Sequence, residues 1–502
     1  MKFLIPLLLI VAPLAAQEII DIGTQRELFV ESSLVDRLEG EATLRMHHPV
    51  ARVIAISHDV PWEGTSSGYH TVFQDGDIYR MYHRGLHIDV SEGKISTGRH
   101  EPFYCYAESK DGIEWTRPEL GIIEFEDSKK NNIILRGPGT HNFAPFKDAN
   151  PDCEPEARYK ALGGGQSGLI AFQSADGVHW SPMNDGKPVI TAGAFDSQNL
   201  GFWDPTIGKY RAYWRIFTEG ITTAEVWKPA GVRAIRTATS SDFITWEEDA
   251  DLKYEDSPEE QLYTNQVSPY VRAQQVLIGL PTRYIDRGWS PAMEALPDAD
   301  DRKLRASANE RYGTALTEVV LMASRDGVNF KRWNEAFMRP GIERPGTWQY
   351  GQHYAACHAV VTKSTLPGAG DELSIYASES GWHGVGNAIR RYTLRLDGFV
   401  SVNASAKGGE VITKPFKFGG NQLELNFSTS AVGSVFVEIQ SPDGTPLDGF
   451  SLADCHEMFG DTTERTVLWK DQKAVSELAG KPVRLRFSLK DADLYAYRFT
   501  DN

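Results

Sequence analysis

One seven-residue pattern recurs four times in this chain and constrains its fold more than any other feature. The pattern is Ser-x-Asp followed by three residues and an aromatic, and its copies begin at Ser109, Ser174, Ser240 and Ser324. A β-rich run precedes each copy, the Ser and Asp favour a tight turn, and the aromatic residue begins the next strand. Each copy therefore predicts a β-hairpin. The acids of the pattern are predicted to be turn residues: Asp111, Asp176, Asp242 and Asp326.

Two further strand-like runs joined by a turn lie before each hairpin, which gives four strands per repeat. These pairs are 70–73 with 78–83, 143–146 with 159–162, 200–203 with 210–216, and 267–271 with 275–280. A fifth repeat, with runs at 353–361, 373–377 and 391–396, lacks the Ser-x-Asp turn but continues with Asp397-Gly398-Phe399. Four strands in each of five repeats predict a five-bladed β-propeller.

The repeat ends near residue 412, and alternating apolar and polar runs follow it, which predicts a C-terminal β-sandwich. No long stretch with helical periodicity occurs outside the N-terminal segment, so the predicted fold class is all-β. The expected organisation is a signal peptide at 1–16, a segment at 17–49 that leads into the propeller, a catalytic propeller at 50–412 and a sandwich at 413–502.

The N-terminus and the charge balance narrow the range of partners. Met1-Lys2, an apolar run to Leu14 and Ala15-Ala16 are typical of a secretory signal peptide cleaved near Ala16, which predicts a secreted or periplasmic protein. No other run is long enough to span a bilayer, so no membrane insertion is expected. The chain has 52 Lys and Arg against 68 Asp and Glu, and no basic run, which argues against nucleic acid as a partner. Its 4 Cys lack any metal-ligand or CxxC spacing.

The polar residues expected around the propeller funnel point to a carbohydrate partner. In propeller enzymes the innermost strand of each blade begins at the funnel, and the second strand returns to it. The expected substrate-binding residues at these places are His70, Arg84, His141, Asn142, Gln198, Asn199, Arg215, Asn265, Gln266, Arg283, His353 and Trp382. Amides and imidazoles beside aromatic faces suit a ligand with many hydroxyl groups and an apolar ring face.

The arginines and histidines of this set each have more than one possible partner. Arg84, Arg215 and Arg283 would add a preference for sulfate or carboxylate through bidentate pairing, unless each one pairs with an acid of a neighbouring loop. His70 and the two other expected funnel histidines could converge on a structural cation at the propeller axis, but their spacing is no metal signature and we favour hydrogen bonding to sugar. No metal or other cofactor is required by this interpretation.

Glycoside hydrolysis needs two carboxyl groups across the scissile bond. Four acids are expected to reach the funnel and are the candidate catalytic residues: Asp196, Glu379, Glu63 and Glu260. For each one the alternative is a solvated loop acid or the partner of an arginine. The sequence does not give the separation of the carboxylates, so it does not distinguish retention from inversion.

These features together resemble the five-bladed propeller glycosidases of glycoside hydrolase families 32, 43, 68 and 117, and secreted bacterial proteins similar to family 32. The resemblance rests on the Ser-x-Asp-Gly-x-x-Trp hairpins, on inner-strand pairs such as 202–210, and on a sandwich after the propeller. It departs from the family at the first blade, where Ser67-Gly-Tyr-His70 stands near the place of Asn-Asp-Pro-Asn-Gly. A second departure is Asp196-Ser-Gln-Asn199, which stands in place of Arg-Asp-Pro.

Our main hypothesis is a secreted glycoside hydrolase that cleaves an oligo- or polysaccharide. An anionic polysaccharide, sulfated or uronic, is among the expected substrates. One alternative is a propeller that binds glycans without catalysis. Another is a lyase acting on uronic acids, in which His or Tyr abstracts a proton and Arg neutralises the carboxylate. Two carboxyl groups about 5 to 10 Å apart across the funnel would favour the hydrolase, and a cluster of His, Tyr and Arg without that pair would favour the lyase.

Overall fold

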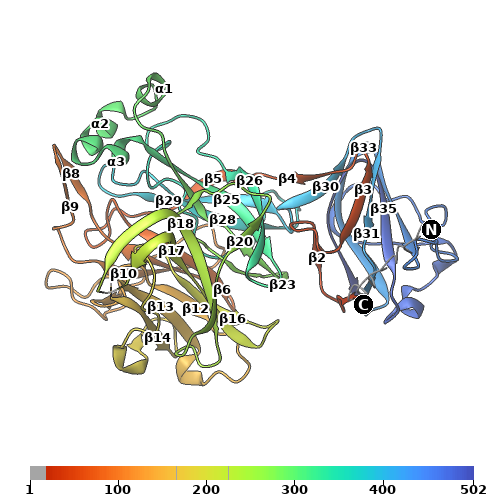
Figure 1. Cartoon of the computed structure of the whole chain (residues 1–502), viewed down its shortest axis with the longest axis horizontal. Coiled ribbons are helices and arrows are strands. Elements are labelled where there is room, and N and C mark those ends of the chain that lie inside the picture. The colour runs from red at the N-terminus through yellow and green to blue at the C-terminus, as the bar shows by residue number, and fades with distance from the viewer. Residues whose placement is uncertain (1–18, 166, 224, 502) are drawn as a thin grey trace, which may run out of the picture. The chain divides into compact units, whose positions relative to one another are not determined.

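The computed structural model describes residues 19–165, 167–223 and 225–501, and strands are their main regular secondary structure (Figure 1). The chain divides into two compact units. The large unit holds residues 28–32 and 44–402, and the small unit holds the described residues up to 27, residues 33–43 and residues 403–501. The expected signal peptide at 1–16 lies outside the described residues. No helix in the described part of the chain is long and apolar enough to cross a membrane.

The first three sheets of the large unit are four-stranded and antiparallel. The first contains β6 (Gly68–Asp75), β7 (Ile78–Gly85), β10 (Phe103–Ser109) and β11 (Ile133–Arg136). The second contains β12 (Ala144–Lys147), β13 (Tyr159–Gly165), β14 (Gly168–Ser174) and β15 (Ser181–Pro182). The third contains β16 (Leu200–Asp204), β17 (Lys209–Thr222), β18 (Trp227–Ser240) and β19 (Glu247–Asp251). The predicted pairs of first and second strands in these repeats are confirmed.

The fourth sheet has more strands than the first three, and the fifth sheet takes one strand from an earlier part of the chain. The fourth contains β20 (Lys253–Glu255), β21 (Gln261–Leu262), β22 (Ser268–Tyr270), β23 (Ala273–Gly279), β24 (Thr282–Asp286), β25 (Ala315–Ser324) and β26 (Asn329–Met338). The fifth contains β27 (Val360–Lys363), β28 (Asp371–Glu379), β29 (Ala388–Arg395) and the early strand β5 (Val50–Ser57). β5 pairs antiparallel with β29, so a strand from before the first sheet completes the last one.

Short elements fill the connections of the large unit. Between β24 and β25 lie α1 (Pro291–Glu294), α2 (Ala299–Ala308) and α3 (Glu310–Thr314), which the sequence did not predict and which lie close together in Figure 1. β8 (Asp89–Ser91) and β9 (Lys94–Ser96) form a small ribbon, and 3-10 turns occur at Pro155–Ala157 and Asn184–Gly186. The long connections at 85–102 and 284–317 are therefore partly structured.

The predicted turn role of the repeated acids is confirmed. Oδ1 of Asp111 accepts hydrogen bonds from the backbone N–H groups of Ile113 and Glu114 at 2.8 and 2.9 Å, and Ser109 Oγ accepts one from Gly112 at 2.9 Å. The turns at the other three acids repeat this pattern. In the first sheet the chain returns only as a single bridge after the turn, and β11 supplies the fourth strand.

Buried clusters connect successive sheets of the large unit. Phe73 and Tyr104 of the first sheet share one cluster with Phe143, which precedes β12, and with Phe172 of the second sheet. A larger cluster joins the second, third and fourth sheets, and another joins the fifth sheet to the first through Ile389 and Met81. Aromatic and branched side chains on the strands provide this packing, which favours strands over helices. The first strands of these sheets thus approach one another, and the ends of those strands position the site.

The small unit is built on two long strands, β33 (Gln422–Gln440) and β35 (Arg484–Thr500), which pair antiparallel, and it also holds the separate two-stranded sheet of β1 and β32. Its other strands are β1 (Ile20–Asp21), β2 (Glu27–Leu28), β3 (Val35–Gly40), β31 (Gly409–Thr413), β32 (Phe416–Lys417) and β34 (Asp461–Thr466). Two 3-10 turns occur at Lys470–Gln472 and Val475–Leu478, and β4 (Thr43–Met46) and β30 (Val400–Ala404) lie where the chain passes between the units.

The unit boundaries differ from those expected. The small unit begins at residue 403 rather than 413, and it includes part of the segment 17–49 that we expected to lead into the propeller. The reason is pairing across the sequence, because β3 pairs with β31 and β1 pairs with β32. The four cysteines are free, with Cys153 half-buried and the other three buried.

Candidate functional site

A cavity of about 250 Å³ lies at the starts of the first strands of the large unit. Its wall takes residues from the segments before β6, β12, β16 and β27 and from α3. Charged and aromatic side chains in this wall indicate a ligand site: Tyr69, Arg84, His141, Asp196, Tyr263, Arg311, Tyr312, Tyr350, Tyr354 and Trp382. Of the expected site residues, four lie in this wall: Arg84, His141, Asp196 and Trp382. We call this cavity the polar funnel.

Asp196 is the acid that the polar funnel exposes. Its side chain is 59% exposed, His141 Nε2 lies 2.9 Å from Oδ1, and the Tyr263 hydroxyl donates to Oδ2 at 3.4 Å. The surrounding wall by itself raises the pKa of Asp196, but the hydrogen bond from His141 and the charge of Arg215 outweigh it and hold that pKa well below its ordinary value. Asp196 is therefore ionised at any pH near neutrality and accepts hydrogen bonds from its neighbours.

Two arginines face this carboxylate without forming an ion pair among the described residues. The Arg84 guanidinium lies 4.7 Å from the Tyr69 ring and donates to the backbone oxygens of Ser66 and His141 at 3.1 and 3.3 Å. Arg215 lies 4.7 Å from the Tyr263 ring, and its Nη1 is buried without a hydrogen-bond partner. Arg84 lines the cavity and forms no ion pair among the described residues, so it can pair with an anionic ligand, whereas Arg215 is buried outside the wall.

A third guanidinium and several aromatic rings complete the wall. Arg311 of α3 lies 4.8 Å from the Tyr312 ring. The rings of Tyr263 and Tyr354 stack at 5.4 Å, and Trp382 meets Tyr350 edge to face at 5.5 Å. Burial raises the pKa of Tyr69, Tyr350 and Tyr354 well above the ordinary value, so these hydroxyls stay protonated. Rings of this kind offer flat faces to a sugar and hydroxyls to its oxygens.

The amides expected to bind substrate instead tie the first strands together. Gln198 donates to the backbone oxygens of Tyr69 and His70 at 3.0 and 3.2 Å, and Gln266 donates to Gln198 Oε1 at 2.6 Å. The other amides do the same: Asn142 and Asn199 donate to Phe195 O, and Asn265 donates to Gln198 O. All five are at most 2% exposed. A buried polar side chain at a strand end forms hydrogen bonds with nearby backbone groups, and it is then not free to bind a ligand.

Two of the expected catalytic acids are partners of arginines and lie outside the funnel wall. Glu379 is 2% exposed, and its Oε1 accepts from Arg390 Nε at 2.7 Å and from Arg344 Nη2 at 2.5 Å. Glu260 pairs with Arg283 at 2.8 Å and with Arg332 at 3.1 Å. Arg283 also pairs with Glu318, so it does not join the other two arginines. The alternative stated for the candidate acids, that each is the partner of an arginine, therefore applies to Glu379 and Glu260.

Glu63 and His70 lie in a buried cluster behind the funnel. Glu63 is 0% exposed and contacts His58, His83 and Arg117 at 2.8 to 3.1 Å. His70 contacts His58 at 2.9 Å. His353, also buried, contacts the Tyr392 hydroxyl at 2.8 Å. The three histidines considered for an axial cation are therefore engaged in three separate contacts rather than with one another.

Several residues of the funnel wall were not among the substrate-binding residues expected from the sequence. Tyr69, Tyr263 and Tyr354 stand beside expected residues in the same first-strand segments, so an aromatic residue repeated at those starts was the available signal. Arg311 and Tyr312 come from the helical insertion before β25. No repeat marks them, because the insertion occurs in one sheet only.

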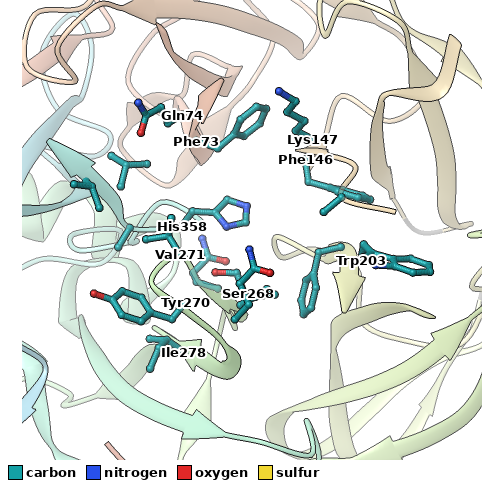
Figure 2. A pocket seen from close by; sticks show the side chains of 18 of the residues that line it. Phe73, Gln74, Phe146, Lys147, Trp203, Ser268, Tyr270, Val271, Ile278 and His358 are labelled. Carbon is teal, nitrogen blue, oxygen red and sulfur yellow. The ribbon is translucent and has the colours of Figure 1, made fainter. Parts of the chain in front are cut away.

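A second cavity of similar volume, about 290 Å³, lies at the opposite ends of the same first strands. Figure 2 shows Phe73, Phe146 and Trp203 around it, with His358 near its centre. No acid or arginine lines it among the described residues. The two cavities are thus similar in volume but differ in chemistry, because Asp196 and arginines line the polar funnel and Lys147 is the one charged lysine, arginine or acid that lines the second cavity among the described residues.

No protein-family model matches this sequence, and no curated protein matches it. Solved structures match it at low identity. They include an N-acetylgalactosamine deacetylase from F. plautii, in complex with blood group B trisaccharide, at 14% identity and a TM-score of 0.40 over 70% of this chain and 94% of that chain. An endo-arabinase from Bacteroides thetaiotaomicron has 11% identity and a TM-score of 0.36 over 68% and 98%. A glycoside hydrolase has 10% identity and a TM-score of 0.37 over 88% and 100%.

Proposed function

We propose that this protein is a secreted glycan-active enzyme that cleaves the glycosidic bond of an acidic sugar in the polar funnel. In this proposal the five sheets are the blades of a five-bladed propeller and the small unit is a β-sandwich. The observation that carries it is the ionised Asp196 held between His141 and the Tyr263 hydroxyl, in the same cavity wall as Arg84, which forms no ion pair among the described residues. An acidic sugar supplies the missing anion, and the aromatic wall supports its ring.

The reaction follows from the roles that these groups can take. Some glycosidases use Tyr in place of a carboxylate nucleophile. Asp196 accepts the proton of the Tyr263 hydroxyl while that oxygen attacks the anomeric carbon, as a base beside a weak nucleophile does. His141 protonates the leaving oxygen and then takes a proton from the water that attacks the anomeric carbon. This second step releases the sugar and the Tyr263 oxygen, which regains its proton from Asp196. Arg84 pairs with the carboxylate of the sugar and fixes its orientation.

A lyase acting on uronic acids is the second candidate. The funnel wall contains one carboxylate among the described residues, beside His, Tyr and Arg side chains, whereas an ordinary glycosidase needs two. By the criterion stated from the sequence, this arrangement favours the lyase over a glycosidase with two carboxylates. In a lyase, His141 would abstract the proton next to the sugar carboxylate while Arg84 neutralises the charge that develops. A tyrosine hydroxyl would then protonate the leaving oxygen, and the product would carry a carbon–carbon double bond.

The first experiment incubates the full-length mature protein with a panel of neutral, sulfated and uronic polysaccharides. It follows new reducing ends and the ultraviolet absorbance of unsaturated products. Reducing ends without absorbance support hydrolysis, and both signals together support the lyase. A carboxyl-reduced form of the same polymer should be a poor substrate in either case. Binding without any product would contradict both reactions and favour a non-catalytic glycan-binding protein.

The residue assignment is tested with Asp196→Asn and Tyr263→Phe. Each should lower kcat/KM by roughly 10²- to 10⁴-fold, because each removes the proton transfer or the nucleophile while it keeps the shape of the site. Asp176→Asn is the matched control, since Asp176 is a turn acid with the same chemistry outside the funnel wall. Full activity in both funnel variants would show that the assignment is wrong even if the substrate class is correct.

A further inference from the structure

Three buried imidazoles meet behind the polar funnel. His58 follows β5, His70 lies on β6 and His83 lies on β7, and their exposed fractions are 0%, 2% and 0%. One ring nitrogen from each lies within 4.8 Å of those of the other two. The ring centroids are 4.5 to 5.4 Å apart. None of the three lines the funnel, so the proposed reaction does not account for them.

Glu63 fixes the orientation of two of these rings. Its Oε2 lies 2.8 Å from His58 Nδ1, and its Oε1 lies 2.9 Å from His83 Nε2. An ionised carboxylate only accepts hydrogen bonds, so these two ring nitrogens carry the protons. The lone pairs of the two rings are therefore at His58 Nε2 and His83 Nδ1.

The two lone pairs are placed differently in the cluster. His58 Nε2 lies 2.9 Å from His70 Nε2, whereas His83 Nδ1 is buried and has no hydrogen-bond partner. Leaving a buried acceptor unsatisfied is unfavourable, and such groups in native proteins usually have an ion or water as their partner. A cation between the three rings would satisfy His83 Nδ1 and would replace the contact between His58 and His70.

We propose that His58, His70 and His83 bind one divalent transition-metal ion, of which Zn²⁺ is the best match. Imidazole nitrogens suit this class of ion, and a metal-bound His usually donates its other N–H to a carboxylate, as His58 and His83 do to Glu63. The overlapping group of Glu63, His83 and Cys105 provides the nearest carboxylate and thiol for a fourth ligand position.

The position of the site indicates what the ion would do. His58 follows β5, which pairs with β29 in the fifth sheet, whereas β6 and β7 belong to the first sheet. One ion would therefore join the strand that completes the last sheet to the first two strands of the first sheet. The expected role is to stabilise this junction, apart from the chemistry of the funnel.

The experiment uses the untagged full-length mature protein, purified without chelator. Metal analysis should find one Zn²⁺ per chain. Removal of the ion by a strong chelator under mild denaturation should lower the Tm, and added Zn²⁺ should restore it. Protein refolded with Co²⁺ should show the visible absorption of a cobalt ion with nitrogen ligands, a readout that needs no variant.

His83→Ala and His70→Ala should each lose the bound ion and the Zn²⁺-dependent rise in Tm. His353→Ala is the matched control, because it removes an equally buried histidine outside the cluster and should keep one ion per chain. Wild-type protein that takes up neither Zn²⁺ nor Co²⁺ would overturn the proposal. So would retention of the ion by a folded His83→Ala variant. If both variants fail to fold, the cobalt spectrum of the wild type decides.

Discussion

At the scale of single residues, surroundings rather than chemical identity separate the four candidate acids. Asp196 is solvent-exposed in the polar funnel beside His141, whereas Glu379 is buried against two arginines and Glu63 is buried against two histidines and Arg117. The pKa of all three carboxyls lies below the ordinary value although burial opposes this, because a positive or hydrogen-bonding group accompanies each. A lowered pKa alone therefore does not identify the reactive acid, and access to the cavity does.

Glu379→Gln should destabilise the protein with little direct effect on the funnel chemistry. The change removes the negative partner of Arg344 and Arg390 in a buried position, and we expect a loss of roughly 2–4 kcal/mol in the free energy of unfolding at pH 7. Urea unfolding followed by tryptophan fluorescence measures it. Glu343→Gln, at an exposed acid nearby, is the control and should be neutral.

The same variant predicts a change in pH dependence. The pKa of Glu379 is lower in the folded protein than in the unfolded chain, where it is about 4.3. Its contribution to stability is therefore complete above about pH 5 and is lost as the pH falls through the folded-state pKa. Between pH 5 and pH 3 the wild type should lose stability more steeply than Glu379→Gln. Parallel curves for the two proteins would contradict the ion-pair assignment.

At the scale of elements, side-chain amides connect the first strands of different sheets, in addition to the backbone hydrogen bonds within each sheet. Gln198 precedes β16 and reaches the backbone of residues 69 and 70 in the first sheet, and it accepts from Gln266 of the fourth. One amide thus connects three sheets near the starts of their first strands. This explains why amides recur at positions where we expected substrate contacts.

Gln198→Ala should cost roughly 2–4 kcal/mol, because it leaves buried carbonyls and the Gln266 amide without partners. Thermal unfolding should show the loss directly. Gln274→Ala removes an exposed glutamine of β23 and should change the Tm little. If Gln198→Ala keeps the Tm but weakens glycan binding, the earlier assignment of Gln198 to the substrate would be restored.

At the scale of the whole molecule, both units are completed by early parts of the chain. β5 completes the fifth sheet of the large unit, and β3 pairs with β31 of the small unit. Neither pairing is visible as a local pattern, because each joins segments hundreds of residues apart. The repeat therefore predicted the number of sheets but gave no indication of the strands that complete them.

A fragment of residues 403–501 should not fold alone, although it contains most of the small unit. It lacks β3, which leaves one edge of β31 unpaired, and β1, which pairs with β32. The same fragment joined to residues 19–43 by a flexible linker should give a dispersed amide NMR spectrum and cooperative unfolding. A dispersed spectrum from 403–501 alone would contradict this prediction.

The sequence by itself determined the features that depend on neighbouring residues: the strand periodicity, the hairpin turns at the four repeated acids and the predominance of β-structure. Four expected site residues, Arg84, His141, Asp196 and Trp382, do lie in the cavity wall, because the starts and ends of strands can be predicted from neighbouring residues. The tertiary structure decided which polar groups reach a ligand. Glu379, Glu260 and Arg283 find their partners on other segments, and a buried charge or amide takes the partner that the fold brings to it before any ligand.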